Sequence, residues 1–128
     1  MKPRINFVTL GVLDMVAMRA FYERLGLVAS SASNPDVTFF DANGIVLALF
    51  GYHALAEDAG VKAGPVPAFR GVGVAWNAVN EDEVNRIMAH AQAAGGIITV
   101  SGILGVGYMT LRNHHGRRRR TVISGTAP

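Results

Sequence analysis

Four histidines are the residues in this chain whose chemistry would most readily make a site: His53, His90, His114 and His115. Imidazole binds divalent metals and carries protons near neutral pH. However, His90 lies off the apolar stripe of its predicted helix, and the adjacent pair His114 and His115 would point to opposite sides of any strand. These histidines are therefore not predicted to form a metal site, and no catalytic residue is assigned among them.

Other catalytic signatures are also missing from the sequence. There is no cysteine, which excludes disulfides, thiolate zinc sites and cysteine nucleophiles. No Gly-x-Ser-x-Gly elbow occurs, and Gly71-Val72-Gly73 lacks the third glycine of a dinucleotide-binding turn. A catalytic pairing of His53 with Glu57 or Asp58 is a weaker candidate than a metal site formed by the histidines.

Basic charge is concentrated in one short segment. The chain has 12 Lys and Arg against 9 Asp and Glu, but four of the basic residues are Arg117, Arg118, Arg119 and Arg120. This run could bind an anionic polymer, or it could be a solvated tail. Nucleic-acid binders usually spread basic residues over a face with interleaved aromatics, so nucleic acid is not the expected partner.

The first half of the chain is predicted to fold as strand, helix and three strands. Strands are expected at 5–10, 27–29, 37–40 and 45–50, and Asn43-Gly44 is a strong hairpin signal. Asp14 is the expected N-cap of a helix that Gly26 ends, with apolar residues at helical spacing between them.

The same order of elements is predicted to occur again in the second half. Strands are expected at 72–76, 97–100, 108–111 and 122–124, and Asn80 with Glu83 predicts a capping box for a helix that Gly95 and Gly96 end. The fold class is therefore α+β: two βαβββ modules forming a curved, half-open mixed sheet with helices on the convex side. One domain is expected over 1–128, with module one at about 4–51, a linker at about 52–69 and module two at about 70–128.

Several motifs in this order resemble the vicinal oxygen chelate superfamily, which includes glyoxalases, bleomycin-resistance proteins and extradiol dioxygenases. The resemblance covers about residues 4–100 and rests on the following segments: Val8-Thr9-Leu10-Gly11-Val12 with Asp14, Phe21-Tyr22, Leu25-Gly26-Leu27, Phe39-Phe40, the strand 45–50, the segment 54–60, and Ala93-Ala94-Gly95-Gly96. It implies the glyoxalase-like fold but not one reaction, because this superfamily supports several chemistries.

Members with metal chemistry hold a divalent ion with His, Glu or Gln from the first and fourth strands of each module. By the resemblance, three of those ligand positions correspond to Phe7, to a position near Leu47 and to a position near Val72. None of these residues can donate a lone pair to a metal ion. Trp76 stands where close relatives often carry a histidine. No Asp or Glu follows Glu83, so the late glutamate ligand is also missing. The expected cofactor is therefore none.

An apolar pocket on the concave face is predicted instead. Strand alternation predicts that seven residues lie there: Phe7, Thr9, Leu47, Leu49, Val72, Val74 and Trp76. As ligand-binding residues they would hold a small apolar or aromatic molecule, chiefly against Phe7 and Trp76. The alternative is that they are ordinary core.

The predicted function is a metal-free small-molecule binding protein of the glyoxalase/bleomycin-resistance type. A divalent-metal-dependent lyase or dioxygenase is the alternative if the chain is an enzyme, and anionic-polymer binding through the arginine run is another. A homodimer is expected, because a half-open sheet leaves edge strands exposed. No apolar run is long enough for a membrane helix and no signal peptide is recognised, so a cytoplasmic protein without a membrane partner is expected.

The family's C-terminal signature is missing where the arginine run begins. The hexapeptide from Arg120 to Gly125 can be encoded as CGG ACG GTC ATC TCT GGG, which gives Asp-Gly-His-Leu-Trp when read from its third base. This is the missing motif, which suggests the hypothesis of a frameshift after about Ile98. The coding DNA tests it directly, and a frameshift would mean that the arginine run has no selected function.

Overall fold

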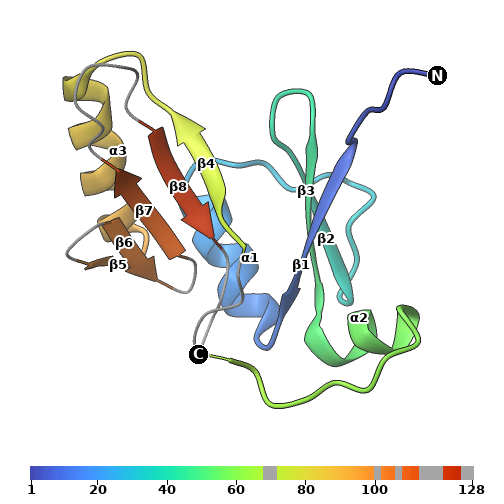
Figure 1. Ribbon diagram of the computed structural model, residues 1–128. Coiled ribbons are helices and arrows are strands. Elements are labelled where there is room, and N and C mark those ends of the chain that lie inside the picture. Colours follow the sequence, from blue (N-terminus) through green and yellow to red (C-terminus); the bar gives the residue numbers. More distant parts are fainter. Residues whose placement is uncertain (68–71, 100–101, 106–107, 113–119, 125–128) are drawn as a thin grey trace. The chain divides into compact units, whose positions relative to one another are not determined.

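The computed structural model describes residues 1–67, 72–99, 102–105, 108–112 and 120–124. The chain forms two compact units, Met1–Pro65 and Val66–Pro128. Each unit contains its own sheet (Figure 1). The fold is α+β, as predicted from the sequence.

The first unit contains three strands and two helices. In chain order they are β1 (Phe7–Val12), α1 (Met15–Arg24), β2 (Val37–Asp41), β3 (Val46–Gly51) and α2 (Tyr52–Asp58). The sheet order is β1-β3-β2, with β1 parallel to β3 and β2 antiparallel to β3. The short strand expected at 27–29 is reduced to one bridge between Ala29 and Phe40.

Helix α1 begins and ends where its capping residues predict. The Asp14 carboxylate accepts a hydrogen bond from the Ala17 N–H at 2.8 Å, which satisfies a free donor of the first turn. Gly26 follows the helix with φ of +107°, a conformation that favours glycine. The Leu27 N–H then donates to the Tyr22 carbonyl, which closes the last turn.

The hairpin between β2 and β3 is also the predicted one. Asn43 and Gly44 have φ of 59° and 103°. A two-residue turn that matches the twist of a hairpin requires positive φ at both of its central residues. The Ala42 N–H donates to the Ile45 carbonyl at 2.8 Å. This turn fixes the register of the two strands, so that Asp41 lies opposite Val46.

One face of the first sheet carries the core of this unit. Side chains of α1 and of this face are almost fully buried, and the set comprises Met18, Phe21, Tyr22, Leu25, Leu10, Val12, Thr38, Phe40, Leu47 and Leu49. The rings of Tyr22 and Phe40 lie 5.7 Å apart, and the Thr38 hydroxyl donates to the Met15 sulfur at 3.6 Å. Each large apolar side chain buried here contributes about 1.5–3 kcal/mol of transfer free energy.

Helix α2 packs against the opposite face of the same sheet, at one end only. Gly11 shares that face with Phe7 and Thr9 through strand alternation. A Cβ at Gly11 would lie 3.2 Å from the Tyr52 ring and 3.3 Å from the Leu55 side chain, so glycine permits this close approach. The sequence analysis placed these residues in the linker expected at about 52–69, and the structure has a seven-residue helix there.

The second unit has one strand more than the predicted module. Its elements are β4 (Val74–Asn77), α3 (Glu81–Ala93), β5 (Gly96–Thr99), β6 (Gly102–Gly105), β7 (Tyr108–Arg112) and β8 (Arg120–Ser124), in the sheet order β4-β8-β7-β6-β5. Asn80 caps α3 by accepting from the Glu83 N–H at 2.9 Å. The Glu83 carboxylate accepts from the Val79 N–H at 2.6 Å, one residue before the position expected for a capping box.

The extra strand β6 corrects the prediction of two identical modules. Successive strands of a meander alternate in direction, so adding one strand reverses the last one. As a result, β4 pairs with β8 in antiparallel fashion, whereas its counterpart β1 is parallel to β3. The second unit therefore departs from the expected order by one added strand, and the first unit departs from it because the strand expected at 27–29 is reduced to a bridge.

Candidate functional site

The face of the first sheet opposite α1 is the candidate site. In the parallel register, Phe7 lies beside Val46 and Thr9 beside Ala48. The antiparallel register places Phe39 beside Ala48 on the same face. Helix α2 covers the Gly11 end of this face, and the end formed by Phe7 lies outside that contact.

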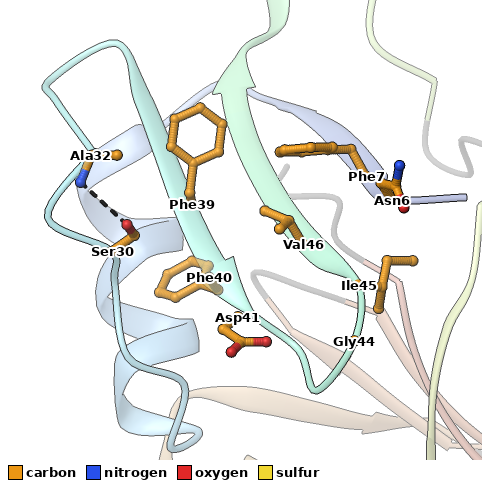
Figure 2. A pocket seen from close by; sticks show the side chains of 10 residues that line it. All are labelled: Asn6, Phe7, Ser30, Ala32, Phe39, Phe40, Asp41, Gly44, Ile45 and Val46. Atoms are coloured by element: carbon orange, nitrogen blue, oxygen red, sulfur yellow. Dashed lines mark hydrogen bonds between the residues drawn. The ribbon is translucent and has the colours of Figure 1, made fainter.

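A pocket of about 610 Å³ lies at this second end of the face. Figure 2 shows that its ten lining residues come from the start of β1, the end of β2, the hairpin with the start of β3, and the loop before β2. Seven of the ten are apolar or glycine. The pocket is open to solvent, which makes it a surface site and not a closed core cavity.

Two phenylalanines form the aromatic part of the pocket. The rings of Phe7 and Phe39 have centroids 6.3 Å apart and planes at 80°, an edge-to-face arrangement. The Phe7 side chain is 57% exposed, so part of its ring is open to solvent. The two rings therefore give the pocket an aromatic wall.

Hydrogen bonds hold the loop that precedes β2 against this strand. The Ser30 N–H donates to the Phe39 carbonyl at 2.8 Å, and the Phe39 N–H donates to the Ser33 hydroxyl at 3.0 Å. The Ser30 hydroxyl accepts from the Ala32 N–H at 3.2 Å (Figure 2). These bonds fix the wall of the pocket formed by Ser30 and Ala32 against the strand that carries Phe39.

The placement predicted for Leu47 and Leu49 was wrong. Both are buried on the α1 side, with exposed fractions of 4% and 0%. The reason is the parallel register, in which Leu47 pairs with Val8 and not with Phe7. A shift of one residue moves every side chain to the other face of the sheet.

Phe7 and Thr9 do share the open face, as predicted, and Phe7 lines the pocket. Val72 precedes β4, whereas Val74 and Trp76 lie on one face of β4. These three residues belong to the second unit, and Trp76 is 40% exposed. Whether any of the seven residues binds a ligand stays a prediction.

The sequence interpretation did not select Phe39, Asp41 and Val46 as site residues. A signal for them was present, because a two-residue turn at Asn43-Gly44 sets the pairing of β2 with β3. Counting back from that turn places Asp41 opposite Val46, with Phe39 two residues along on the same face. Alternation along a single strand does not show this, because the register between neighbouring strands decides which of their side chains share a face.

The side chains on the open face do not make up a divalent-metal site. Phe7, Val46 and Ala48 offer no lone pair, and the neutral hydroxyl of Thr9 is not among the usual ligands of such an ion. Among the described residues of this face, the Asp41 carboxylate is the one strong donor, and a single carboxylate does not complete a ligand set. Within the residues that the structure describes, no group of three or more His, Asp or Glu side chains is placed to hold a metal ion. His114, His115 and the arginines at 117–119 lie outside the described residues.

Comparison with known proteins defines the family. The family model of the Glyoxalase/Bleomycin resistance protein/Dioxygenase superfamily matches residues 4–117. The chain therefore belongs to this superfamily, as the quoted motifs indicated. The match extends beyond the 4–100 span of those motifs, and the frameshift after about Ile98 stays a hypothesis.

Solved structures agree with this assignment. The chain is similar to a glyoxalase-related enzyme from Fulvimarina pelagi, with 30% identity, a TM-score of 0.62, and coverage of 84% of this chain and 78% of that one. It shares the fold of a glyoxalase/bleomycin resistance protein/dioxygenase from Nocardioides, with 24% identity, a TM-score of 0.70, and coverage of 98% and 78%. No curated protein matches the chain. Among the described residues, no helix has the length and apolar character needed to cross a membrane.

Proposed function

We propose that this protein binds a small apolar or aromatic molecule, without a metal ion, in the pocket on the open face of its first sheet. The observation that carries the proposal is the edge-to-face pair of the exposed Phe7 and the half-buried Phe39 in a pocket of about 610 Å³. This volume is in the range of small-molecule sites, which are mostly apolar with few polar groups.

The residue types on the face also favour binding without a metal. The resemblance implies ligands at the first-strand and last-strand positions of the module, where this chain has Phe7 and the neighbours Val46 and Ala48. Phe7 and Val46 line the pocket, so their apolar side chains add to the surface that a ligand could cover, whereas Ala48 is buried. A homodimer, a cytoplasmic location and a contribution from Trp76 stay predictions.

Titration of the ¹⁵N-labelled protein with a panel of neutral aromatic compounds tests the proposal. We expect the amide signals of Phe7, Phe39 and Val46 to shift, and excess chelator to leave the shifts unchanged. Replacing Phe7 by alanine removes one aromatic wall and should weaken binding by about 3- to 10-fold.

Val16→Ala is the matched control, because Val16 is 81% exposed on α1 and does not line the pocket. It should bind like the unmodified protein. Equal binding by Phe7→Ala would contradict the assignment of the pocket. Shifts that disappear with chelator would favour the metal-dependent alternative.

A further inference from the structure

We infer that this pocket, if it is the ligand site proposed above, prefers a planar aromatic cation to a neutral or anionic compound, with the Asp41 carboxylate as the counter-ion. The inference rests on the proposed function and adds the charge of the ligand. It depends on where Asp41 lies, on the other charges of the pocket, and on the aromatic rings beside it.

Asp41 is the last residue of β2 and shares the pocket face with Phe39. It lies opposite Val46 in the register and lines the pocket (Figure 2). One carboxylate oxygen accepts from the Asn43 N–H at 2.9 Å, a bond that holds the side chain at the start of the turn. An ionised carboxylate has about four acceptor positions, so this bond leaves capacity for a ligand.

Asp41 sets the charge of the pocket. None of the ten residues labelled in Figure 2 is Lys, Arg or His, and Asp41 is the single residue among them that ionises. Asp41 has no ion-pair partner among the described residues. The salt bridge between Arg19 and Glu23 lies on α1 and does not involve the pocket. The pocket therefore carries one negative charge, which attracts cations and repels anions.

The aromatic rings favour the same class of ligand. A cation over the face of an aromatic ring is attracted by the ring quadrupole. Because Phe7 is 57% exposed and stands at 80° to Phe39, a planar ligand can contact aromatic surface while its charge lies toward Asp41. For a solvent-exposed ion pair, the expected preference is on the order of fivefold in affinity.

Three two-ring probes of similar size separate charge from shape: N-methylquinolinium as the cation, naphthalene as the neutral compound and 1-naphthalenesulfonate as the anion. Each is titrated into the ¹⁵N-labelled protein at low ionic strength. We expect the cation to bind about fivefold more tightly than the neutral probe, and the anion to bind more weakly than both. Raising the ionic strength should weaken cation binding and leave neutral binding unchanged.

Asp41→Asn removes the charge but keeps an oxygen that can accept from the Asn43 N–H, so the hairpin should persist. In this variant the cation should bind no more tightly than the neutral probe, whose affinity should be unchanged. Asp36→Asn is the control, because Asp36 is exposed and lies outside the pocket lining, and it should keep the cation preference.

The outcomes distinguish this inference from the proposed function. Equal affinities for cation and neutral probe in the unmodified protein, or a cation preference that survives Asp41→Asn, would overturn the charge assignment while the pocket stands. If none of the probes shifts the signals of Phe7, Phe39 or Val46, the proposed function itself is wrong.

Discussion

The buried hydroxyl group of Tyr22 offers a sharp test of how the first unit is packed. Tyr22 is 1% exposed, and its ring lies 5.2 Å from that of Phe21 and 5.7 Å from that of Phe40. Its hydroxyl oxygen has no hydrogen-bond partner among the described residues. Replacing Tyr22 by phenylalanine keeps the ring and removes this unpaired polar atom.

The expected effect is an increase in stability. An unpaired buried hydroxyl costs about 1–3 kcal/mol relative to the unfolded state, where water satisfies it. The void left by one oxygen atom costs a few tenths of a kcal/mol at roughly 24 cal/mol per Å³. Tyr22→Phe should therefore raise the free energy of unfolding by about 1 kcal/mol, and the melting temperature by about 4 °C.

The pH dependence gives a second, independent readout. Burial raises the pKa of Tyr22 above its ordinary value. Below about pH 10 the hydroxyl is protonated in both states, and its protonation adds no pH dependence. Above that pH the unfolded chain ionises first, so stability falls by up to about 1.4 kcal/mol per pH unit. The phenylalanine variant lacks this term, so its advantage should grow as the pH rises above 10.

Urea unfolding of the two proteins, at neutral pH and above pH 10, measures both effects. Tyr22→Leu is the control at the same position, since it also loses the ring and should destabilise by about 2 kcal/mol. A phenylalanine variant that is less stable than the unmodified protein at neutral pH would refute the reasoning. It would mean that the hydroxyl group has a partner in solution.

Two further predictions concern the local structure that supports the site. Gly11→Val should destabilise the protein by about 1–3 kcal/mol in urea unfolding, because a Cβ there would lie 3.2 Å from the Tyr52 ring and 3.3 Å from the Leu55 side chain. Gly11→Ala should cost less, and a valine variant with unchanged stability would show that α2 does not pack on this face. Asp14→Ala should cost about 1 kcal/mol by removing the acceptor for the Ala17 N–H, whereas Asp14→Asn should stay within about 0.5 kcal/mol. Equal losses in the two Asp14 variants would indicate that charge, and not the hydrogen bond, is responsible.

Much of the first unit follows from local signals in the sequence. Asp14 and Gly26 mark the ends of α1, and Asn43-Gly44 marks the hairpin, because each residue suits a specific backbone conformation. The apolar spacing of α1 predicts the face that it buries. The motifs also predicted the superfamily, which the family comparison confirmed.

The sequence interpretation failed where pairing between distant strands mattered. Strand β6 has glycine at both ends and two apolar residues between them, so its local preference for a strand is weak. Its pairing with β5 and β7 makes it a strand. The reversal of β8 relative to β4 then follows from this one added strand.

By itself, the sequence determined helix α1 with its caps, the hairpin and the family, because these depend on residues close together along the chain. Tertiary structure decided which side chains share the open face. Alternation within β1 and within β3 is fixed by geometry, but the register between them depends on how the whole unit packs around α1. That register placed Leu47 and Leu49 in the core and left Phe7, Val46 and Phe39 together at the pocket.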